Sequence, residues 1–123
     1  MPGAAHPPYV AHCLELLAPH GAVRARRMFG GHGLYVDDLF VAIIAAEQLY
    51  LKVDSETRAR FEAAGCRPFT YDAKGQAMTM GYFAAPEDAM ESTQAMLPWA
   101  RLAIASALRA RAARPAPRRR SKA

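Results

Sequence analysis

The chain has 123 residues and a formal net charge of +5, from 16 Lys and Arg against 11 Asp and Glu. This length suits one domain, and a hydrophobic content of 52% excludes a wholly disordered protein. No apolar run reaches the roughly 20 residues of a membrane-spanning helix, and the N-terminal sequence lacks the pattern of a secretory signal. The sequence therefore predicts a globular cytoplasmic protein with no membrane partner.

The positive charge is concentrated at the C-terminal end. Seven of the 16 basic residues lie at or after Arg109, where there is no acidic residue, and residues 1–108 carry a net charge of −2. The candidate nucleic-acid contacts are Arg109, Arg111, Arg114, Arg118, Arg119, Arg120 and Lys122. Such binding would be weak and independent of base sequence, because no aromatic ring lies among these residues to stack on a base. A solubilising tail explains the same charges equally well.

The first part of the chain predicts an arm, a helix and a β-meander. Residues 1–8 are expected to form a flexible arm, followed by a helix that ends at Pro19. Its apolar face consists of Val10, Cys13, Leu14 and Leu17. Four strands should follow, beginning near Arg26, Leu34, Leu39 and Leu49. Asp37 and Asp38 predict the turn between the second and third of these strands.

The second part predicts a helix, a hairpin and two further helical segments. A surface helix, capped by Asp54 or Ser55, should end at Gly65 in a left-handed conformation. Strands at 69–71 and 78–82 form the hairpin, a helical turn begins at Pro86, and Ser92 or Thr93 caps the last helix. The fold class is therefore α+β, with helices packed on an antiparallel sheet of about six strands in the order α-β-β-β-β-α-β-β-α-α. The domain is expected to span residues 9–112, with a disordered basic tail over 113–123.

The last helix is apolar around much of its circumference. Such a helix is either buried against the sheet or used in self-association. The candidate interface residues are Trp99, Leu102, Ile104 and Leu108. They favour a homodimer, because they exceed what one small sheet needs to cover it.

The segment Gly30-Gly31-His32-Gly33 has two interpretations. Glycine loops bind phosphate through backbone N–H groups, but the Lys and Ser/Thr of a P-loop do not follow here. A bulge or tight bend, for which glycine supplies a positive φ, explains the run more simply. The least favoured function is a small ligand-binding or enzymatic domain around this run, with Arg27, His32 and Tyr35. No catalytic or cofactor-binding residue is predicted, and the histidines and the two cysteines lack the spacing of a metal site.

Several motifs together indicate a known family. The segments "RMFGG-G-LY", "LYLKVD" and "PFTY" occur in this order, with Met80-Gly81-Tyr82 and Trp99-Ala100 further on. The first motif comprises Arg27, Met28, Phe29, Gly30, Gly31, Gly33, Leu34 and Tyr35. This combination resembles the N-terminal domain of the TfoX/Sxy proteins over roughly residues 10–108.

The resemblance implies a secretion-chaperone-like α+β fold. It also implies a role like that of bacterial regulators of competence for DNA uptake, which act with the transcription machinery. Many members carry a second, helical C-terminal domain, for which this chain is expected to have no room. The function expected is that of a non-enzymatic regulatory or interaction domain, which presents a sheet edge or its last helix to a protein partner or a second copy. The aromatic residues expected to build its core are Phe29, Tyr35, Tyr50, Phe69, Tyr71, Tyr82 and Trp99.

Overall fold

The computed structural model describes residues 7–28, 30–73 and 76–113, and it describes those between 71 and 80 by their backbone. The elements are α1 (Pro8–Leu17), η1 (Ala18–His20), β1 (Val23–Met28), β2 (Gly31–Val36), β3 (Leu39–Ala45), β4 (Gln48–Lys52), α2 (Arg58–Ala63), β5 (Pro68–Ala73), β6 (Gln76–Ala84), η2 (Glu87–Glu91) and α3 (Thr93–Ala113). The predicted α+β fold and element order are confirmed. Phe29, most of the predicted arm and most of the predicted tail lie outside the described residues.

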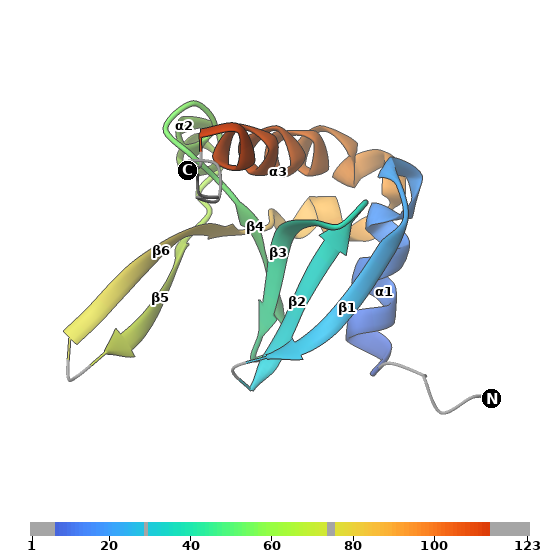
Figure 1. The fold of residues 1–123 in the computed structure, drawn as a ribbon, viewed down its shortest axis with the longest axis horizontal. Helices are drawn as coiled ribbons and strands as arrows, with labels where there is room; N and C mark the ends of the chain where they lie inside the picture. Colours follow the sequence, from blue (N-terminus) through green and yellow to red (C-terminus); the bar gives the residue numbers. More distant parts are fainter. Residues whose placement is uncertain (1–6, 29, 74–75, 114–123) are drawn as a thin grey trace, which may run out of the picture.

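The six strands form one open antiparallel sheet in the order β1-β2-β3-β4-β6-β5. Figure 1 shows β1 to β4 side by side and the β5–β6 hairpin extending away from them. Asp37 and Asp38 form the turn between β2 and β3, as predicted, with φ of +49° and +66°. Positive φ at both turn residues matches the right-handed twist of the flanking strands. Ala46 and Glu47 make the next turn in the same way, with φ of +51° and +58°.

The core lies between one face of the sheet and the helices. Alternate strand residues such as Leu34, Val36, Leu49 and Leu51 point into it, as the two-residue period of a strand requires. Helix α3 packs on β3 and β4, and α1 packs against α3 and β1. Phe61 of α2 completes the core and is fully buried.

Two helix details differ from the sequence prediction. On α1 the buried residues are Val10, Cys13, Leu16 and Leu17, so Leu16 takes the place expected for Leu14, which is only half-buried. This correction reflects the position of α1, which packs against both α3 and β1 and so buries a wider face than one stripe. Helix α2 begins at Arg58, four residues after Asp54 and three after Ser55, the two predicted caps. It ends at Ala63, and Gly65 follows in the predicted left-handed conformation, with φ of +80°.

The glycine run is divided between a turn and a strand. Gly30 has φ of +79° and makes the predicted bend between β1 and β2. Gly31 and Gly33 instead lie inside β2. Glycine is needed at these positions because neighbouring atoms leave no room for a side chain. A Cβ at Gly31 would collide with the Ile44 carbonyl oxygen, and one at Gly33 would lie 2.7 Å from both Met28 Cε and Phe40 Cε1. Gly30 therefore serves the bend, and Gly31 and Gly33 serve strand packing in β2.

Candidate functional site

The side of the sheet opposite the helices carries a row of stacked side chains. Strand register places Arg24 of β1 opposite Tyr35 of β2, and Tyr35 opposite Phe40 of β3. The Arg24 guanidinium lies 4.5 Å from the centre of the Tyr35 ring, and the Tyr35 and Phe40 rings stack at 5.1 Å. Phe40 contacts Tyr82 at 6.0 Å, and Lys52 Nζ lies 5.1 Å from the Tyr82 ring. We call these five residues the aromatic row and this side of the sheet the open face.

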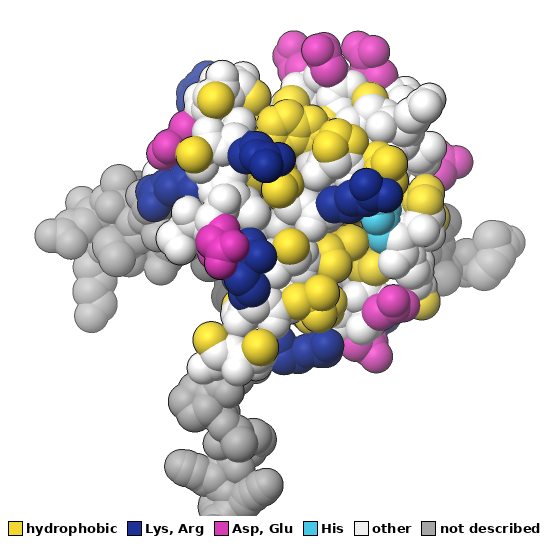
Figure 2. All heavy atoms as spheres, turned by 90° about the horizontal axis from the view of Figure 1, so that it is seen from above, with side chains coloured by type: hydrophobic (Ala, Val, Ile, Leu, Met, Phe, Trp, Pro, Cys, Tyr) yellow, Lys and Arg dark blue, Asp and Glu magenta, His cyan; other side chains and the backbone are white. Residues whose placement is uncertain are grey.

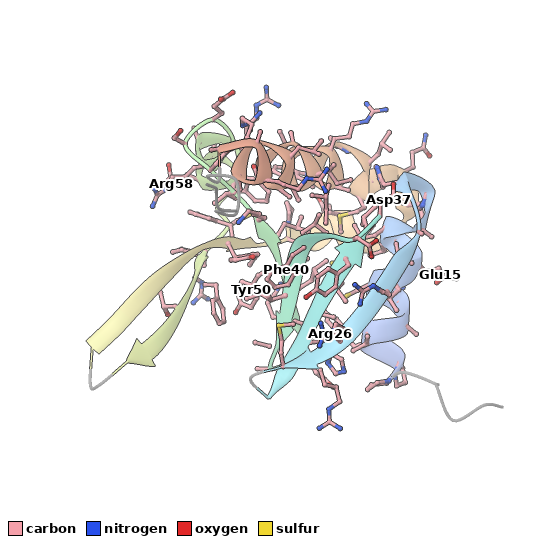
Figure 3. All side chains as sticks on the ribbon, in the orientation of Figure 1. Glu15, Arg26, Asp37, Phe40, Tyr50 and Arg58 are labelled. Carbon is pink, nitrogen blue, oxygen red and sulfur yellow. The ribbon has the colours of Figure 1, made fainter. Side chains whose placement is uncertain are left out.

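A second line of side chains runs beside the aromatic row. Register places Arg26 opposite Gly33, Gly33 opposite Ile43, and Ile43 opposite Tyr50. Tyr50 meets the edge of Phe69 on β5, with ring centres 4.8 Å apart. In Figure 3 Phe40 and Tyr50 lie in the angle between the β5–β6 hairpin and strands β2 and β3. The open face thus combines aromatic rings with three cations.

The prediction that Tyr35 and Tyr50 build the main core is wrong. Tyr35 and Tyr50 are half-buried on the open face, because Leu34, Val36, Leu49 and Leu51 occupy the alternate positions that face the helices. Phe69 is also half-buried there, against Tyr50.

The remaining aromatic residues expected in the core differ in where they lie. Trp99 packs on the core as predicted, 5.0 Å from Phe61. Tyr82 is buried as predicted, but on the open face among its neighbours in the aromatic row and not between the sheet and the helices. This burial raises the pKa of its hydroxyl to about 12. Phe29 and the side chain of Tyr71 lie outside the part of the chain that the structure describes.

Sequence analysis missed the aromatic row as a unit. Phe40 is not among the site residues that the sequence predicts. The available signal was alternation: Arg24 and Arg26 share one face of a strand, and so do Tyr50 and Lys52. The register that joins these faces into one row comes only from the tertiary structure.

A groove of about 890 Å³ runs from the open face to the helical side of the molecule. Its lining includes Tyr50, Pro68, Cys66, Glu87 and Trp99. Burial raises the pKa of the Cys66 thiol, which lowers its thiolate fraction and hence its reactivity. This environment agrees with a structural cysteine. The groove also brings Trp99, one of the predicted interface residues, beside the open face.

The predicted interface residues on α3 differ in exposure. Leu102 and Ile104 are partly buried and pack against the core, as Trp99 does. Leu108 is 43% exposed and is the exposed large hydrophobic residue among those that the structure describes. Figure 2, which looks down on the helical side, shows hydrophobic side chains in several groups separated by Lys and Arg. The homodimer on this helix stays a prediction.

Of the seven predicted nucleic-acid contacts, the structure describes two, Arg109 and Arg111. Arg109 donates hydrogen bonds to both carboxylate oxygens of Asp54, at 2.6 and 3.0 Å, and lies 3.4 Å from Glu56. Binding phosphate would require this arginine to leave its carboxylates. Arg111 is exposed on the last turn of α3. The other predicted contacts, Arg114, Arg118, Arg119, Arg120 and Lys122, lie outside the described residues.

The residues expected for the least favoured function, a ligand-binding or enzymatic site around residues 30–33, do not come together in space. His32 and Leu34 share the core-facing side of β2, whereas Tyr35 lies on the open face. His32 has no hydrogen bond or ion pair with any residue in the described ranges. Within those ranges there is also no group of three His, Cys, Asp or Glu placed to hold a metal ion. None of the described helices combines the length and the apolar composition needed to cross a membrane.

Comparison with known proteins agrees with the sequence motifs. The family profile of the TfoX N-terminal domain matches residues 15–107. A curated relative, DNA transformation protein TfoX1 of Aliivibrio fischeri, is 36% identical over 63 residues, which are 51% of this chain and 30% of that protein. The chain thus spans about a third of the length of this relative. Because the profile covers most of the chain, including all six strands and most of α3, the protein belongs to the TfoX N-terminal domain family.

Proposed function

We propose that the protein is a non-enzymatic regulatory domain, similar in role to the competence regulators of its family, and that it acts by binding another protein. The observation that carries the proposal is the open face, where the aromatic row and Tyr50 lie opposite the helices and beside a groove. The residues that dominate binding energy in protein interfaces are enriched in tyrosine, tryptophan and arginine. The name of the A. fischeri relative, a DNA transformation protein, supports the regulatory part.

The arrangement of the cations favours a protein partner over a nucleic acid. Proteins that bind single strands stack successive bases on free aromatic ring faces. Here Arg24 covers one face of Tyr35, Phe40 covers the other, and Lys52 lies over Tyr82. A protein partner can instead pack against ring edges and aliphatic side chains such as Ile43. The family resemblance favours the transcription machinery as the source of this partner.

Site-specific photo-crosslinking in the native host tests the proposal. Benzoylphenylalanine replaces Tyr50 on the open face, and in a matched strain it replaces Ala59, which is exposed on α2. The expected result is a crosslinked adduct from position 50 that protease removes and nuclease does not, with no such adduct from position 59. The adduct should disappear when Phe40→Asp is added, because a half-buried carboxylate between Tyr35 and Tyr82 disrupts the row.

The outcomes of this experiment separate the two candidate partner classes. Adducts that nuclease removes would favour the nucleic-acid alternative and overturn the proposal. Equal adducts from positions 50 and 59 would show random encounter and overturn it as well. Circular dichroism of the Phe40→Asp protein distinguishes loss of the surface from loss of the fold.

A further inference from the structure

Strand β1 forms an edge of the sheet. Within the described residues it pairs as a strand with β2 and with no other strand. Alternate N–H and C=O groups on its outer side are therefore available to another strand, because each strand of an antiparallel pair directs only half of these groups to its neighbour.

The side chains of β1 make this edge strongly cationic. Arg24, Arg26 and Arg27 are all exposed, and β1 contains no acidic residue. Among the described residues Arg24 forms one ion pair, with Asp38 at 3.3 Å, and both side chains are exposed. Arg26 and Arg27 form no ion pair with any other residue that the structure describes. Figure 3 shows Arg26 beside β1 and β2, on the same side of the sheet as Phe40.

The other side of the same edge has an apolar pocket near the start of β1, and strand alternation places the exposed Arg27 on this side near its end. A pocket of about 410 Å³ lies between α1 and the start of β1. It is lined mainly by apolar side chains, among them Ala11, Leu14, Ala18 and Val23, with His12 and Glu15 as its polar members. The edge thus offers positive charge on the open face and an apolar pocket on the helical face.

We infer that the β1 edge binds an extended segment of a partner protein as an added strand, and that acidic and apolar residues alternate along this segment. The inference rests on the proposed function, since it takes the partner to be a protein. Successive side chains of a strand point to opposite faces, so an alternating segment directs its acidic residues toward Arg24 and Arg26 and its apolar residues toward the pocket. Neighbouring strands lie about 4.8 Å apart, close enough for cross-strand ion pairs.

Charge complementarity selects this occupant over a second copy of the chain. Two β1 edges in an antiparallel pair would bring arginines of one copy next to arginines of the other, and like charges on neighbouring strands are destabilising. Exposed basic residues on edge strands commonly prevent such self-pairing. An acidic segment turns the same charges into favourable contacts. A nucleic acid would meet the arginines but would use neither the apolar pocket nor the strand hydrogen bonds.

Fluorescence anisotropy with the full chain and two labelled peptides tests the inference. One peptide alternates four Glu with four Val, and the other has the same composition in block order. The alternating peptide should bind at least about fivefold more tightly, since only it presents acids and apolar groups on opposite faces. Arg26→Glu should weaken its binding by about tenfold or more. Arg60→Glu, the same charge change at an exposed site on α2, should leave binding within about twofold.

Amide hydrogen exchange supplies a second measurement. The alternating peptide should slow exchange in β1 and leave α2 unchanged, because an added strand protects outward N–H groups. Equal binding of both peptides, or protection away from β1, would overturn the inference. So would tighter binding of a labelled oligothymidylate that protects no β1 amide, which would indicate phosphate contacts. If these results occur while Tyr50 crosslinks to a protein, only the β1 inference fails; if Tyr50 yields no protein adduct, the proposed function fails.

Discussion

At the scale of single residues, Asp54 joins three parts of the chain. Its carboxylate accepts hydrogen bonds from the N–H groups of Glu56 and Thr57, so it closes the turn before α2 and, contrary to the sequence prediction, does not cap the helix itself. It also accepts the paired hydrogen bonds of Arg109, 55 residues away. The Arg109 hydrogen bond is the main cause that lowers the pKa of Asp54 from 3.8 to about 2. The family motif "LYLKVD" therefore ends on a residue that attaches α3 to the sheet.

The pH dependence of stability should reveal this carboxylate. Because its pKa is lower in the folded state, its stabilising contribution is complete above its unfolded pKa of 3.8 and is lost as the pH falls toward about 2. Asp54→Asn should lower the free energy of unfolding at neutral pH by about 1 kcal/mol. Its melting temperature should also fall less steeply than that of the wild type between these pH values.

Asp38→Asn is the matched control, since the Arg24–Asp38 pair is exposed and weak. Thermal unfolding of the three proteins at closely spaced pH values measures both effects. If Asp54→Asn leaves the pH dependence of the melting temperature the same as in the wild type, Asp54 is not the carboxylate that causes it.

At the scale of elements, α3 is held to the sheet side by a buried polar contact as well as by apolar packing. Thr57 and Ser106 are the buried polar residues among those described, and their hydroxyl oxygens lie 3.0 Å apart. The Thr57 hydroxyl also accepts a hydrogen bond from the Asp54 N–H at 3.0 Å. Hydrophobic periodicity predicts the helix α3, but not this contact, because Thr57 and Ser106 are 49 residues apart.

Substitutions at the two hydroxyls should have unequal effects. Ser106→Ala should cost about 1 kcal/mol, since Thr57 keeps its other partner. Thr57→Ala should cost about 2 to 3 kcal/mol, because it leaves the Asp54 N–H without its acceptor and opens a small cavity. Urea unfolding of both single variants and the double variant measures these free energies. Strict additivity in the double variant would show that the two hydroxyls are not coupled.

At the scale of the whole molecule, charge is distributed differently from what the net value of +5 indicates. Arg109 is neutralised by Asp54 and Glu56, so structurally it belongs to the domain and not to the basic end. Within the domain, the open face and the β1 edge carry unpaired cations even though residues 1–108 have a net charge of −2. A domain whose acidic residues offset its basic ones thus still presents a local cationic surface.

Nucleic-acid binding by the C-terminal residues should therefore be separable from the domain. If about five of these charges contact phosphates, the logarithm of affinity for a labelled duplex should fall with the logarithm of salt concentration with a slope of roughly −4 to −5. Deletion of residues 114–123 should remove this binding, whereas Arg109→Ala should barely change the slope. Anisotropy at several salt concentrations measures it. Unchanged binding after the deletion would contradict this prediction and would show that the nucleic acid contacts the domain surface.

The sequence alone determined the element types, the fold class and the family. Local rules suffice for the element types and the fold class: helical and strand periodicity, positive φ at Gly30 and Gly65, and turn chemistry at Asp37-Asp38. The family follows instead from the resemblance of the sequence motifs to known proteins. Only the tertiary structure decided that Tyr35, Phe40 and Tyr82 stack on the open face, that Arg109 binds Asp54, and that β1 lies at an edge. The physical reason is that these contacts join residues far apart in the chain. Their geometry depends on strand order and register, which the periodicity of each segment by itself does not specify.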